Sequence, residues 1–347
     1  MKLSICIPTY NRAKHLRNCL QSINIAAQHL DESLKVEICI SDNCSSDATE
    51  DVVRRANLTL PVKYCRNQSN LGIPRNFLNA VDMAKGDFAW LVGDDDLLMP
   101  DSLMRLCKLI DIHPNVDFFY VNAFHLTTEY VLSHSQPFNT VNLPNDMIAF
   151  SGKLESGECQ FLDLIDPKVS FDFLGGMFLA VFRRSKWQEN KHMLDEDAIS
   201  DLRTLSHFDN TFPHVKIFAY AFSKSIAYFN PHPLVVCLSG AREWAPMQSM
   251  IMSVRLIEAL ELYRKVGLGF LRYLKCRNYA LRAFLPQMAW MFLHPKVSGL
   301  RYVKLNKSMF GNLMYPNFYL SPFYYVMRKL GVFISRFNIY SLKQQKL

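Results

Sequence analysis

Three adjacent carboxylates follow an apolar run in the first third of the chain. The run, Phe88–Val92, leads through Gly93 into Asp94, Asp95 and Asp96. Like charges at this spacing repel one another, and a divalent cation or a cationic ligand would relieve the repulsion. The end of a strand is also where α/β sheets bind their ligands. The alternative is a solvated acidic turn, so the cluster is interpreted together with its neighbours.

A second polar segment follows the apolar residues at the start of the chain. A predicted strand ends at Pro8, and Thr9, Asn11 and Arg12 come before a predicted helix. Helix N-termini bind phosphate through their free N–H groups, and an arginine adds a bidentate donor. This segment is therefore a candidate phosphate site. The alternative is an ordinary turn in which Asn11 caps the helix.

Asp42 comes just after the next apolar run, Val36–Ile40. A carboxylate at this position can accept hydrogen bonds from a nucleobase or a ribose. A few residues later, Asp47 and Glu50 have the spacing of a capping box, which starts a helix. We therefore interpret Asp42 as a ligand-binding residue and Asp47 as a helix cap.

A third polar segment, Asn67–Asn76, precedes another predicted helix. Gly72 permits a tight turn, and Arg75 enters the first turn of the helix. The preferred interpretation of Arg75 is a partner for phosphate or for an acidic site. The alternative is an ordinary surface charge.

Strand and helix patterns alternate through the first 120 residues, which predicts an α/β fold with a mostly parallel sheet and helices on both faces. The second part of the chain gives a weaker pattern, with helices throughout from about Trp244. Strands are predicted at Leu3–Ile7, Val36–Ile40, Val62–Cys65, Phe88–Val92, Asp117–Val121, Met177–Phe182, Ile226–Phe229 and Leu234–Leu238, and helices at Leu16–Ala27, Asp47–Arg55, Pro74–Gly86, Asp101–Ile112 and His214–Phe222.

Composition allows a large core and favours a reducing compartment. Half of the 347 residues are hydrophobic, and the nine cysteines form no Cys-x-x-Cys pair. An odd number of cysteines within apolar runs indicates a cytoplasmic protein without a structural zinc site. A strand pattern begins at Leu3, so we expect no signal peptide, and the apolar stretches fall short of the ~20 residues of a spanning helix.

Charge is distributed unevenly along the chain. Residues 255–347 contain 16 Lys and Arg but two acidic residues, whereas the first 254 residues contain 23 Lys and Arg and 29 acidic residues. The basic segment is also rich in Tyr and Phe, which predicts contact with an anionic membrane surface. The alternatives are nucleic acid, which the interleaved Leu, Ile, Val and Met disfavour, and a helical subdomain with a charged outer face.

Together and in this order, the segments resemble family 2 glycosyltransferases of the GT-A fold. The resemblance covers residues 2–120 well and extends loosely to about residue 240, and the most similar subgroup transfers sugars to bacterial O-antigen units. The matching segments are Ile7–Arg12, Asp42–Asp47, Asn70–Gly72 with Arg75 and Asn76, Gly86 with Asp87, and Gly93–Asp96 with Pro100.

The resemblance implies a nucleotide pocket lined by Pro8, Tyr10 and Arg12, with Asp42 contacting the base. It also divides the chain into a catalytic GT-A domain at residues 1–243 and a helical, basic, membrane-associating region at 244–347. Within the first domain, residues 1–120 would bind the nucleotide sugar and residues 121–243 the acceptor.

In this family the acidic motif holds the metal and the ribose diphosphate. Its usual form is Asp-x-Asp-Asp, and Gly93 replaces the first aspartate here. We assign Asp95 and Asp96 to a bound Mg²⁺ or Mn²⁺ and Asp94 to the nucleotide, and a shifted motif of Asp94 with Asp96 is the alternative. Such a metal would neutralise the charge that develops on the leaving diphosphate.

The acceptor hydroxyl must lose a proton to a general base. Family members usually have this base as an acidic residue near a helix start in the second half, and the corresponding segment is 207–214. Its candidates are Asp209 and His214, and the acidic cluster 195–197 is a further alternative. A histidine in the first turn of a helix can equally be structural.

Two other features could contact an acceptor sugar. Residues Phe173–Phe178 include two adjacent glycines, which either let the backbone approach a ligand or form a turn. Trp187 and Trp244 could stack on sugar rings or fill the core.

The resulting hypothesis is a metal-dependent, inverting glycosyltransferase. It would move a sugar from a nucleotide-sugar donor to a polyprenyl-diphosphate-linked saccharide acceptor in bacterial surface polysaccharide synthesis. Its location would be cytoplasmic, peripheral on the inner face of the cell membrane, without a nucleic acid partner. The alternatives are a nucleotidyltransferase, whose Lys-containing phosphate loop is missing, and a non-catalytic nucleotide-sugar-binding protein.

Overall fold

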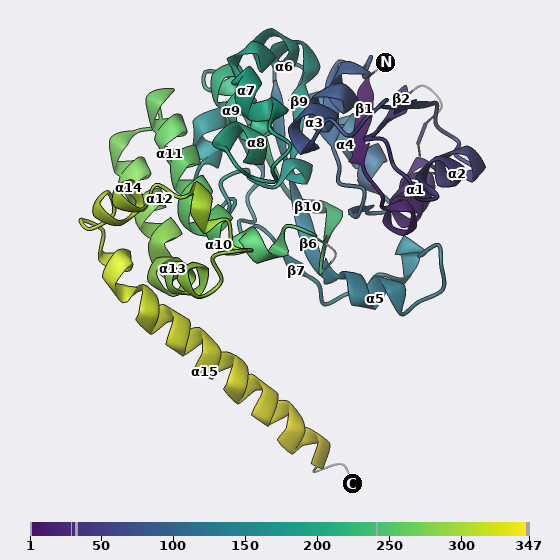
Figure 1. Cartoon of the computed structure of the whole chain (residues 1–347). Coiled ribbons are helices and arrows are strands. Elements are labelled where there is room, and N and C mark those ends of the chain that lie inside the picture. The colour runs from purple at the N-terminus through teal and green to yellow at the C-terminus, as the bar shows by residue number, and fades with distance from the viewer. Residues whose placement is uncertain (1, 29, 32–33, 241, 345–347) are drawn as a thin grey trace. The chain divides into compact units, whose positions relative to one another are not determined.

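The computed structural model describes residues 2–28, 30–31, 34–240 and 242–344, with side chains described as far as residue 330 (Figure 1). The chain forms two compact units. Unit 1 comprises Met1–Ala245 with Leu262–Leu268, and unit 2 comprises Pro246–Glu261 with Gly269–Leu347. The functional roles predicted for the parts of the chain stay predictions.

Unit 1 is built on one mixed sheet, which confirms the α/β prediction. The strand order is β3-β2-β1-β4-β9-β6-β10-β5, with β7 on β6 and β8 on β10. The strands are β1 (Leu3–Thr9), β2 (Val36–Asp42), β3 (Val62–Arg66), β4 (Phe88–Leu91), β5 (Leu97–Leu98), β6 (Phe118–Thr127), β7 (Ile148–Ala149), β8 (Gly157–Gln160), β9 (Ala180–Arg183) and β10 (Ile226–Ser239).

The first half of the sheet is parallel and its central strands are buried. Strands β3, β2, β1 and β4 are parallel neighbours, and every residue of β1 and β2 is buried. Strands buried along their whole length are what a sheet covered on both faces requires. Helix α3 packs on β1 and β2, whereas α1 packs against α2, α4 and β5.

The helices of unit 1 agree closely with the predicted ones in the first half of the chain. The helix predicted from Asp47 begins at Thr49, after Ala48 as its N-cap. The helices are α1 (Ala13–Ala27), α2 (Thr49–Arg55), α3 (Ile73–Asp82), α4 (Ser102–Ile112), α5 (Thr128–Leu132), α6 (Arg184–Asn190), α7 (Glu196–Ser200), α8 (Phe208–Thr211) and α9 (Pro213–Phe222).

Strand β9 joins the two halves of the sheet, because it pairs antiparallel with both β4 and β6. The strand predicted at Met177–Phe182 is shorter than expected, since Met177–Leu179 forms a 3₁₀ turn before it. The two strands predicted near the end of unit 1 are one strand, β10, with register shifts between Asn230 and Val235 against β6. Pro231 and Pro233 lack the N–H group that a regular ladder needs, which explains these shifts.

Aromatic side chains fill the core beneath the second half of the sheet. Phe118 lies edge-on to Phe218, with ring centroids 5.1 Å apart, and Phe182 stacks on Trp187 at 4.8 Å. Trp187 is fully buried, so the core interpretation of this tryptophan is confirmed. Large rings packed in this way stabilise the second half of the sheet.

Unit 2 is helical, as predicted for the chain beyond Trp244. Its buried residues include Cys276, Phe284 and Met288, and the Phe284 ring lies 5.4 Å from that of Phe318. Among the described residues, no helix has both the length and the apolar character needed to cross a bilayer. The helices are α10 (Gln248–Met250), α11 (Leu256–Lys265), which continues into unit 1, α12 (Phe270–Ala280), α13 (Phe284–Leu293), α14 (Leu305–Phe310) and α15 (Pro316–Gln344).

Candidate active site

Three of the polar segments singled out in the sequence meet at one edge of the sheet. Thr9, at the end of β1, is paired in register with Asp42, at the end of β2. The Val92 N–H group donates to the Cys6 carbonyl oxygen over 3.0 Å, which aligns the end of β4 with β1. Parallel strands thus bring residues that are far apart in the sequence together at their carboxyl ends.

The three carboxylates lie inside this edge rather than in a solvated turn. Asp94, Asp95 and Asp96 are 5%, 8% and 1% exposed. The Thr9 hydroxyl donates to Asp94 Oδ2 over 2.8 Å. Arg12 lies against the cluster, with Nε 3.2 Å from Asp94 Oδ1 and Nη2 3.0 Å from Asp95 Oδ2. One guanidinium therefore faces two of the three carboxylates.

Asp96 is the least satisfied member of the cluster. Its Oδ2 accepts a hydrogen bond from the Gly93 N–H over 3.0 Å, but its buried Oδ1 has no hydrogen-bond partner. A buried carboxylate oxygen without a partner is costly and is a suitable ligand for a hard cation. The donor set at this point therefore fits a divalent metal.

The glycine at position 93 has a steric reason. A Cβ atom there would lie 2.8 Å from Asp96 Oδ2 and 2.9 Å from Asp95 Oδ1. Real Cβ atoms do not approach so closely, so an aspartate at position 93 would displace both carboxylates. The departure from the expected acidic motif is therefore a requirement of this packing.

Burial makes the cluster reluctant to ionise. It raises the pKa of Asp94 to about 7, with the charge of Asp95 adding and Arg12 opposing. Burial, together with the charge of Asp95, also raises the pKa of Asp96 well above its ordinary value. Among the described residues, no three His, Cys, Asp or Glu side chains converge to hold a metal on their own. Ligands from a bound diphosphate would have to complete the coordination.

Without a cation, the cluster should reduce stability as the pH rises. The raised pKa of Asp94 means that the folded protein binds this proton more tightly than the unfolded chain. The proton on Asp94 therefore contributes to the free energy of unfolding below pH 3.8, the ordinary pKa, and this contribution is lost as the pH rises to about 7. We expect Asp96→Asn, which removes a carboxyl group whose own pKa is raised by burial, to lessen this loss and to raise the free energy of unfolding at pH 7 by about 1 kcal/mol. Urea unfolding of both metal-free proteins across this pH range measures it, and identical pH slopes would contradict it.

Asp42 has partners for both of its oxygens. Oδ2 accepts from the Tyr64 hydroxyl over 2.6 Å, and Oδ1 accepts from the Ser45 N–H over 2.8 Å. Tyr10 follows Thr9, which is paired in register with Asp42, and is 37% exposed. Asp42 is therefore held rigidly at the sheet edge, and its partner Tyr64 was not identified from the sequence.

Asp47 accepts hydrogen bonds at the starts of two helices, of which only α2 was expected. Its Oδ2 accepts from the Ala13 N–H over 2.9 Å, at the start of α1, while Oδ1 accepts from the Thr49 N–H over 3.1 Å. The predicted capping box is wrong, because Ala48 is the N-cap of α2. The carboxylate ties the starts of two helices together.

Amide side chains join the third polar segment to the same edge. Asn76 accepts from the Ser41 hydroxyl over 2.7 Å and donates to the Thr9 carbonyl over 3.2 Å. Arg75, one residue earlier, turns instead to α7, where it contacts Glu196 and Ser200. Its acidic partner is thus Glu196.

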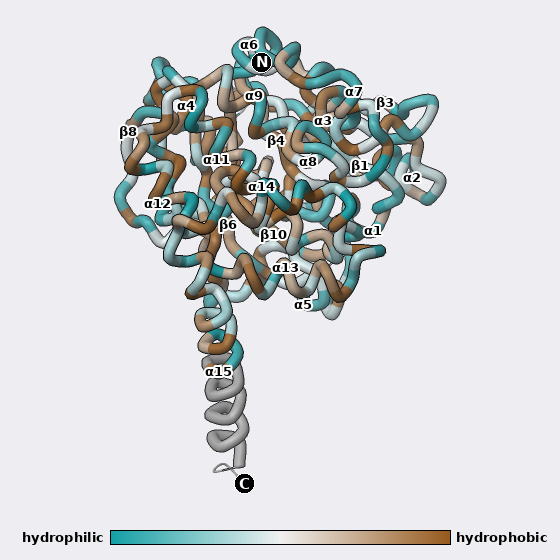
Figure 2. Tube along the Cα trace, turned by 60° about the vertical axis from the view of Figure 1, so that its left-hand side comes forward, coloured by the Kyte–Doolittle hydropathy of each residue, from teal (hydrophilic) through white to brown (hydrophobic). Residues whose placement is uncertain are grey.

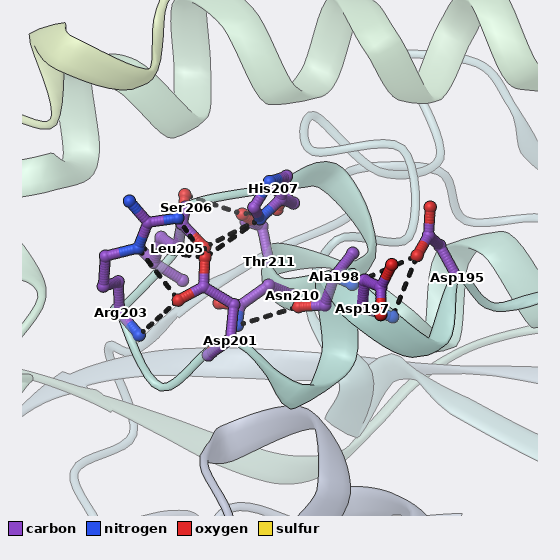
Figure 3. A network of polar contacts seen from close by, with 10 residues as sticks. All are labelled: Asp195, Asp197, Ala198, Asp201, Arg203, Leu205, Ser206, His207, Asn210 and Thr211. Atoms are coloured by element: carbon purple, nitrogen blue, oxygen red, sulfur yellow. Dashed lines mark hydrogen bonds and ion pairs between the residues drawn. The ribbon is translucent and has the colours of Figure 1, made fainter.

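The segment that contains the predicted base is a dense polar network (Figure 3). Asp201 accepts hydrogen bonds from Arg203 and from the Ser206 hydroxyl, and its backbone carbonyl accepts from Asn210 Nδ2 over 2.6 Å. Asp195 caps α7 by accepting from the Asp197 and Ala198 N–H groups (Figure 3). These contacts fix the segment in place.

Asp209 is buried within this segment and has two partners on one oxygen. Its Oδ2 accepts from the Asp195 N–H over 2.7 Å and from Lys216 Nζ over 2.6 Å. The side chains of Asp209 and Lys216 are 7% and 20% exposed. A carboxylate in such a pair has a structural role independent of any catalytic one.

His214 is also inside the protein, at 3% exposure. Its Nε2 lies 3.0 Å from the Gly175 carbonyl oxygen, and Nδ1 is buried without a partner. Burial lowers the pKa of His214 to about 4, so the ring is neutral at pH 7. The contact links the helix start to the two-glycine segment.

Two polar residues that the sequence reasoning missed lie near these groups. Asp172 comes just before the two-glycine segment. Its carboxylate accepts hydrogen bonds from the Ser170 hydroxyl and, over 2.8 Å, from the Gly176 N–H. Burial raises the pKa of Asp172. Arg242 follows β10, and its charge lowers the pKa of both Asp96 and Asp172. The sequence signal that could have identified Arg242 was its position just after a predicted strand. Trp244, a predicted sugar-stacking candidate, lies 5.2 Å from the Arg242 guanidinium.

Known proteins that are similar to this chain include several glycosyltransferases. The family model for glycosyl transferase family 2 matches residues 4–171. The abequosyltransferase RfbV of Salmonella typhimurium is 31% identical over 241 residues, which is 68% of this chain and 66% of that protein. An undecaprenol-linked saccharide β-1,3-glucosyltransferase of Campylobacter jejuni is 35% identical over 110 residues, covering 31% of this chain and 34% of that protein.

The fold has a solved counterpart. The crystal structure of Staphylococcus aureus TarS 1–349 with UDP-GlcNAc superposes with a TM-score of 0.52 at 17% identity, covering 88% of this chain and 77% of that one. The chain spans about two thirds of the abequosyltransferase and smaller parts of the other curated relatives. Family model, relatives and fold agree with the order of the motifs at the sheet edge, and the chain belongs to glycosyltransferase family 2.

Proposed function

We propose that this protein transfers a sugar from a nucleotide-sugar donor to a lipid-linked saccharide acceptor, with a divalent metal at the acidic cluster. The observation that carries the proposal is the buried carboxylate cluster beside Arg12, with the unpaired Oδ1 of Asp96 at the carboxyl ends of parallel strands. Pairing with a metal diphosphate would satisfy both the spare carboxylate charge and the guanidinium.

The donor would occupy the edge formed by β1, β2 and β4. Pro8 and Tyr10 would line the nucleotide pocket, and Asp42 would contact the base. Arg12 lies within reach of the cluster and would bind the diphosphate, with Asp94 beside it. TarS, whose fold this chain shares, has been solved with UDP-GlcNAc, which supports a nucleotide-sugar donor.

Asp95 and Asp96 would hold Mg²⁺ or Mn²⁺. When bound, the metal would supply Lewis-acid stabilisation of the leaving diphosphate. The charge of Arg242 lowers the pKa of Asp96, and we assign Arg242 a positioning role toward this carboxylate. Arg75 would act through Glu196, by fastening α7 to the start of α3.

Three groups are candidates for the general base. Asp209 and His214 remain the candidates from the sequence, and Asp172 joins them from the structure. A base works best when its pKa lies near the operating pH. Burial raises the pKa of Asp172 and lowers that of His214 to about 4, so burial makes the Asp172 carboxylate a stronger base and the His214 ring a weaker one. Asp209 would have to exchange Lys216 for the acceptor hydroxyl.

The acceptor assignment rests on relatives. The names of two relatives describe transfer of abequose and transfer to an undecaprenol-linked saccharide. We infer an acceptor of the polyprenyl-diphosphate type in bacterial surface polysaccharide synthesis, of which O-antigen is the favoured case. Such an acceptor places the reaction at the cytoplasmic face of the cell membrane.

A panel of nucleotide sugars tested by thermal shift with and without Mn²⁺ checks the proposal. A ligand that binds only the folded protein stabilises it by about 2.7 kcal/mol at a hundredfold excess over its Kd. We expect one donor to raise the melting temperature in a concentration-dependent and metal-dependent way. Release of nucleoside diphosphate from that donor should then depend on acceptor. If no nucleotide sugar shifts the melting temperature, the proposed function is wrong.

A further inference from the structure

Exposed apolar side chains are concentrated in unit 2. Of the 27 large hydrophobic residues that are exposed among the described side chains, 16 belong to this unit, although it is much the smaller. They include Leu271 at 81%, Leu293 at 77% and Met314 at 74%. Exposed apolar surface of this extent indicates a site of contact with another protein or with a membrane.

Eight of these 16 residues lie on the described part of α15, which Figure 2 colours by hydropathy. Its start is anchored in unit 2, where Phe318 is buried and the Ser321 hydroxyl accepts from the Leu285 N–H over 3.2 Å. Residues 322–330 are then all exposed. The helix therefore leaves the packing of its own unit after Ser321 while its sequence stays apolar.

Helical periodicity places on one side the exposed apolar side chains of residues 319–330, except that of Tyr325. At 100° per residue, they fall within an arc of about 160°. Arg328 and Lys329 fall outside that arc, and Lys329 Nζ lies 5.7 Å from the centroid of the Tyr325 ring. The residues of the arc, all at least 38% exposed, are Tyr319, Leu320, Phe323, Tyr324, Val326, Met327 and Leu330.

The charge of the surrounding chain indicates which kind of partner the apolar arc of α15 binds. No Asp or Glu occurs after Glu261, whereas 15 Lys and Arg do. An uncompensated positive charge next to an apolar arc matches a bilayer surface with anionic headgroups above an apolar interior. A second copy of the chain would bring like charges together. The described helices do not have the composition of a membrane span, which leaves the helix lying in the interface.

We propose that the arc of α15 inserts into the interface of an anionic membrane, with Phe323 and Met327 near its centre. This surface extends the proposed function, because a lipid-linked acceptor lies in a membrane. Vesicle binding needs neither donor nor catalysis, so the two proposals can fail separately.

The test uses the full chain and vesicles of phosphatidylglycerol with phosphatidylcholine, compared with phosphatidylcholine alone. We expect co-sedimentation with the anionic vesicles, weakening as salt is added. Phe323→Asp should weaken binding at least about tenfold, since burial of a phenylalanine side chain is worth that much. Ile112→Asp, at a 69% exposed position of α4 in unit 1, is the matched control and should bind like wild type.

Circular dichroism and light scattering accompany each variant. A folded Phe323→Asp protein that binds anionic vesicles like wild type overturns the proposal, as does a wild type that ignores them at every salt concentration. If wild type is dimeric and Phe323→Asp is monomeric with unchanged vesicle binding, the arc is a contact between two copies instead. Preferential binding to nucleic acid through Arg328 and Lys329 would likewise replace the membrane as partner.

Discussion

Replacing Asp95 or Asp96 with alanine should remove nearly all sugar transfer while leaving the protein folded. Each carboxylate is assigned to the metal, whose charge stabilisation is worth several kcal/mol in the transition state. The unpaired Oδ1 of Asp96 and the repulsion within the cluster mean that truncation should cost the metal-free protein little stability. Transfer rates and melting temperatures measured on the same samples test both parts.

Asp111→Ala is the matched control for this experiment. Asp111 lies on α4 with a side chain that is 52% exposed, and its partner is Lys2 rather than a member of the cluster. It should transfer at the wild-type rate. Turnover like wild type in both cluster variants would end the metal assignment, whereas unfolding of either would show that the cluster is needed for the fold.

The second large effect concerns Asp209, whose removal should destabilise the protein by about 2–4 kcal/mol. Asp209→Ala would leave Lys216 without its partner in a largely buried position and would orphan the Asp195 N–H. Asp209→Ala combined with Lys216→Met should recover part of the loss, because the unpaired charge is then gone as well. Urea unfolding of the single and double variants measures the coupling.

The folded double variant also separates structure from catalysis at Asp209. If Asp209 is the general base, the double variant should bind donor but lose transfer by a factor of ~10²–10⁴. Wild-type transfer in a stable double variant would exclude Asp209 and leave Asp172 and His214. An uncoupled effect, in which Lys216→Met changes nothing, would contradict the ion-pair account.

The grouping of the polar segments could be predicted because parallel sheets impose a simple rule. Polar residues after Pro8, Ile40 and Val92 had to meet, since the carboxyl ends of neighbouring parallel strands lie at one edge. The sequence could not show why position 93 is a glycine. The turn brings the Asp95 and Asp96 carboxylates against this position and leaves no room for a Cβ atom, and this contact is visible only in the structure.

The second half of the chain was harder to predict because its contacts are set by antiparallel pairing and loops. The helix start at His214 was located correctly. The His214 side chain is buried, and its ring contacts the Gly175 carbonyl oxygen, nearly forty residues earlier in the chain. Arg242 and Asp172 stood alone in the sequence with no motif around them. β10 pairs with β5, which directly follows Asp96, and this long-range pairing brings the end of β10 towards the acidic cluster, where the charge of Arg242 lowers the pKa of Asp96.

The most direct test of the account is whether donor and metal bind together at the acidic cluster. The measurement is the rise in melting temperature produced by a nucleotide sugar, by Mn²⁺ and by both, in wild type and in Asp96→Ala. The account predicts that the two ligands stabilise wild type by more than the sum of their separate effects, because each supplies ligands or charge that the other needs. It predicts that this excess disappears in the variant. An equal excess in both proteins, or donor binding in wild type that is indifferent to Mn²⁺, would contradict the account.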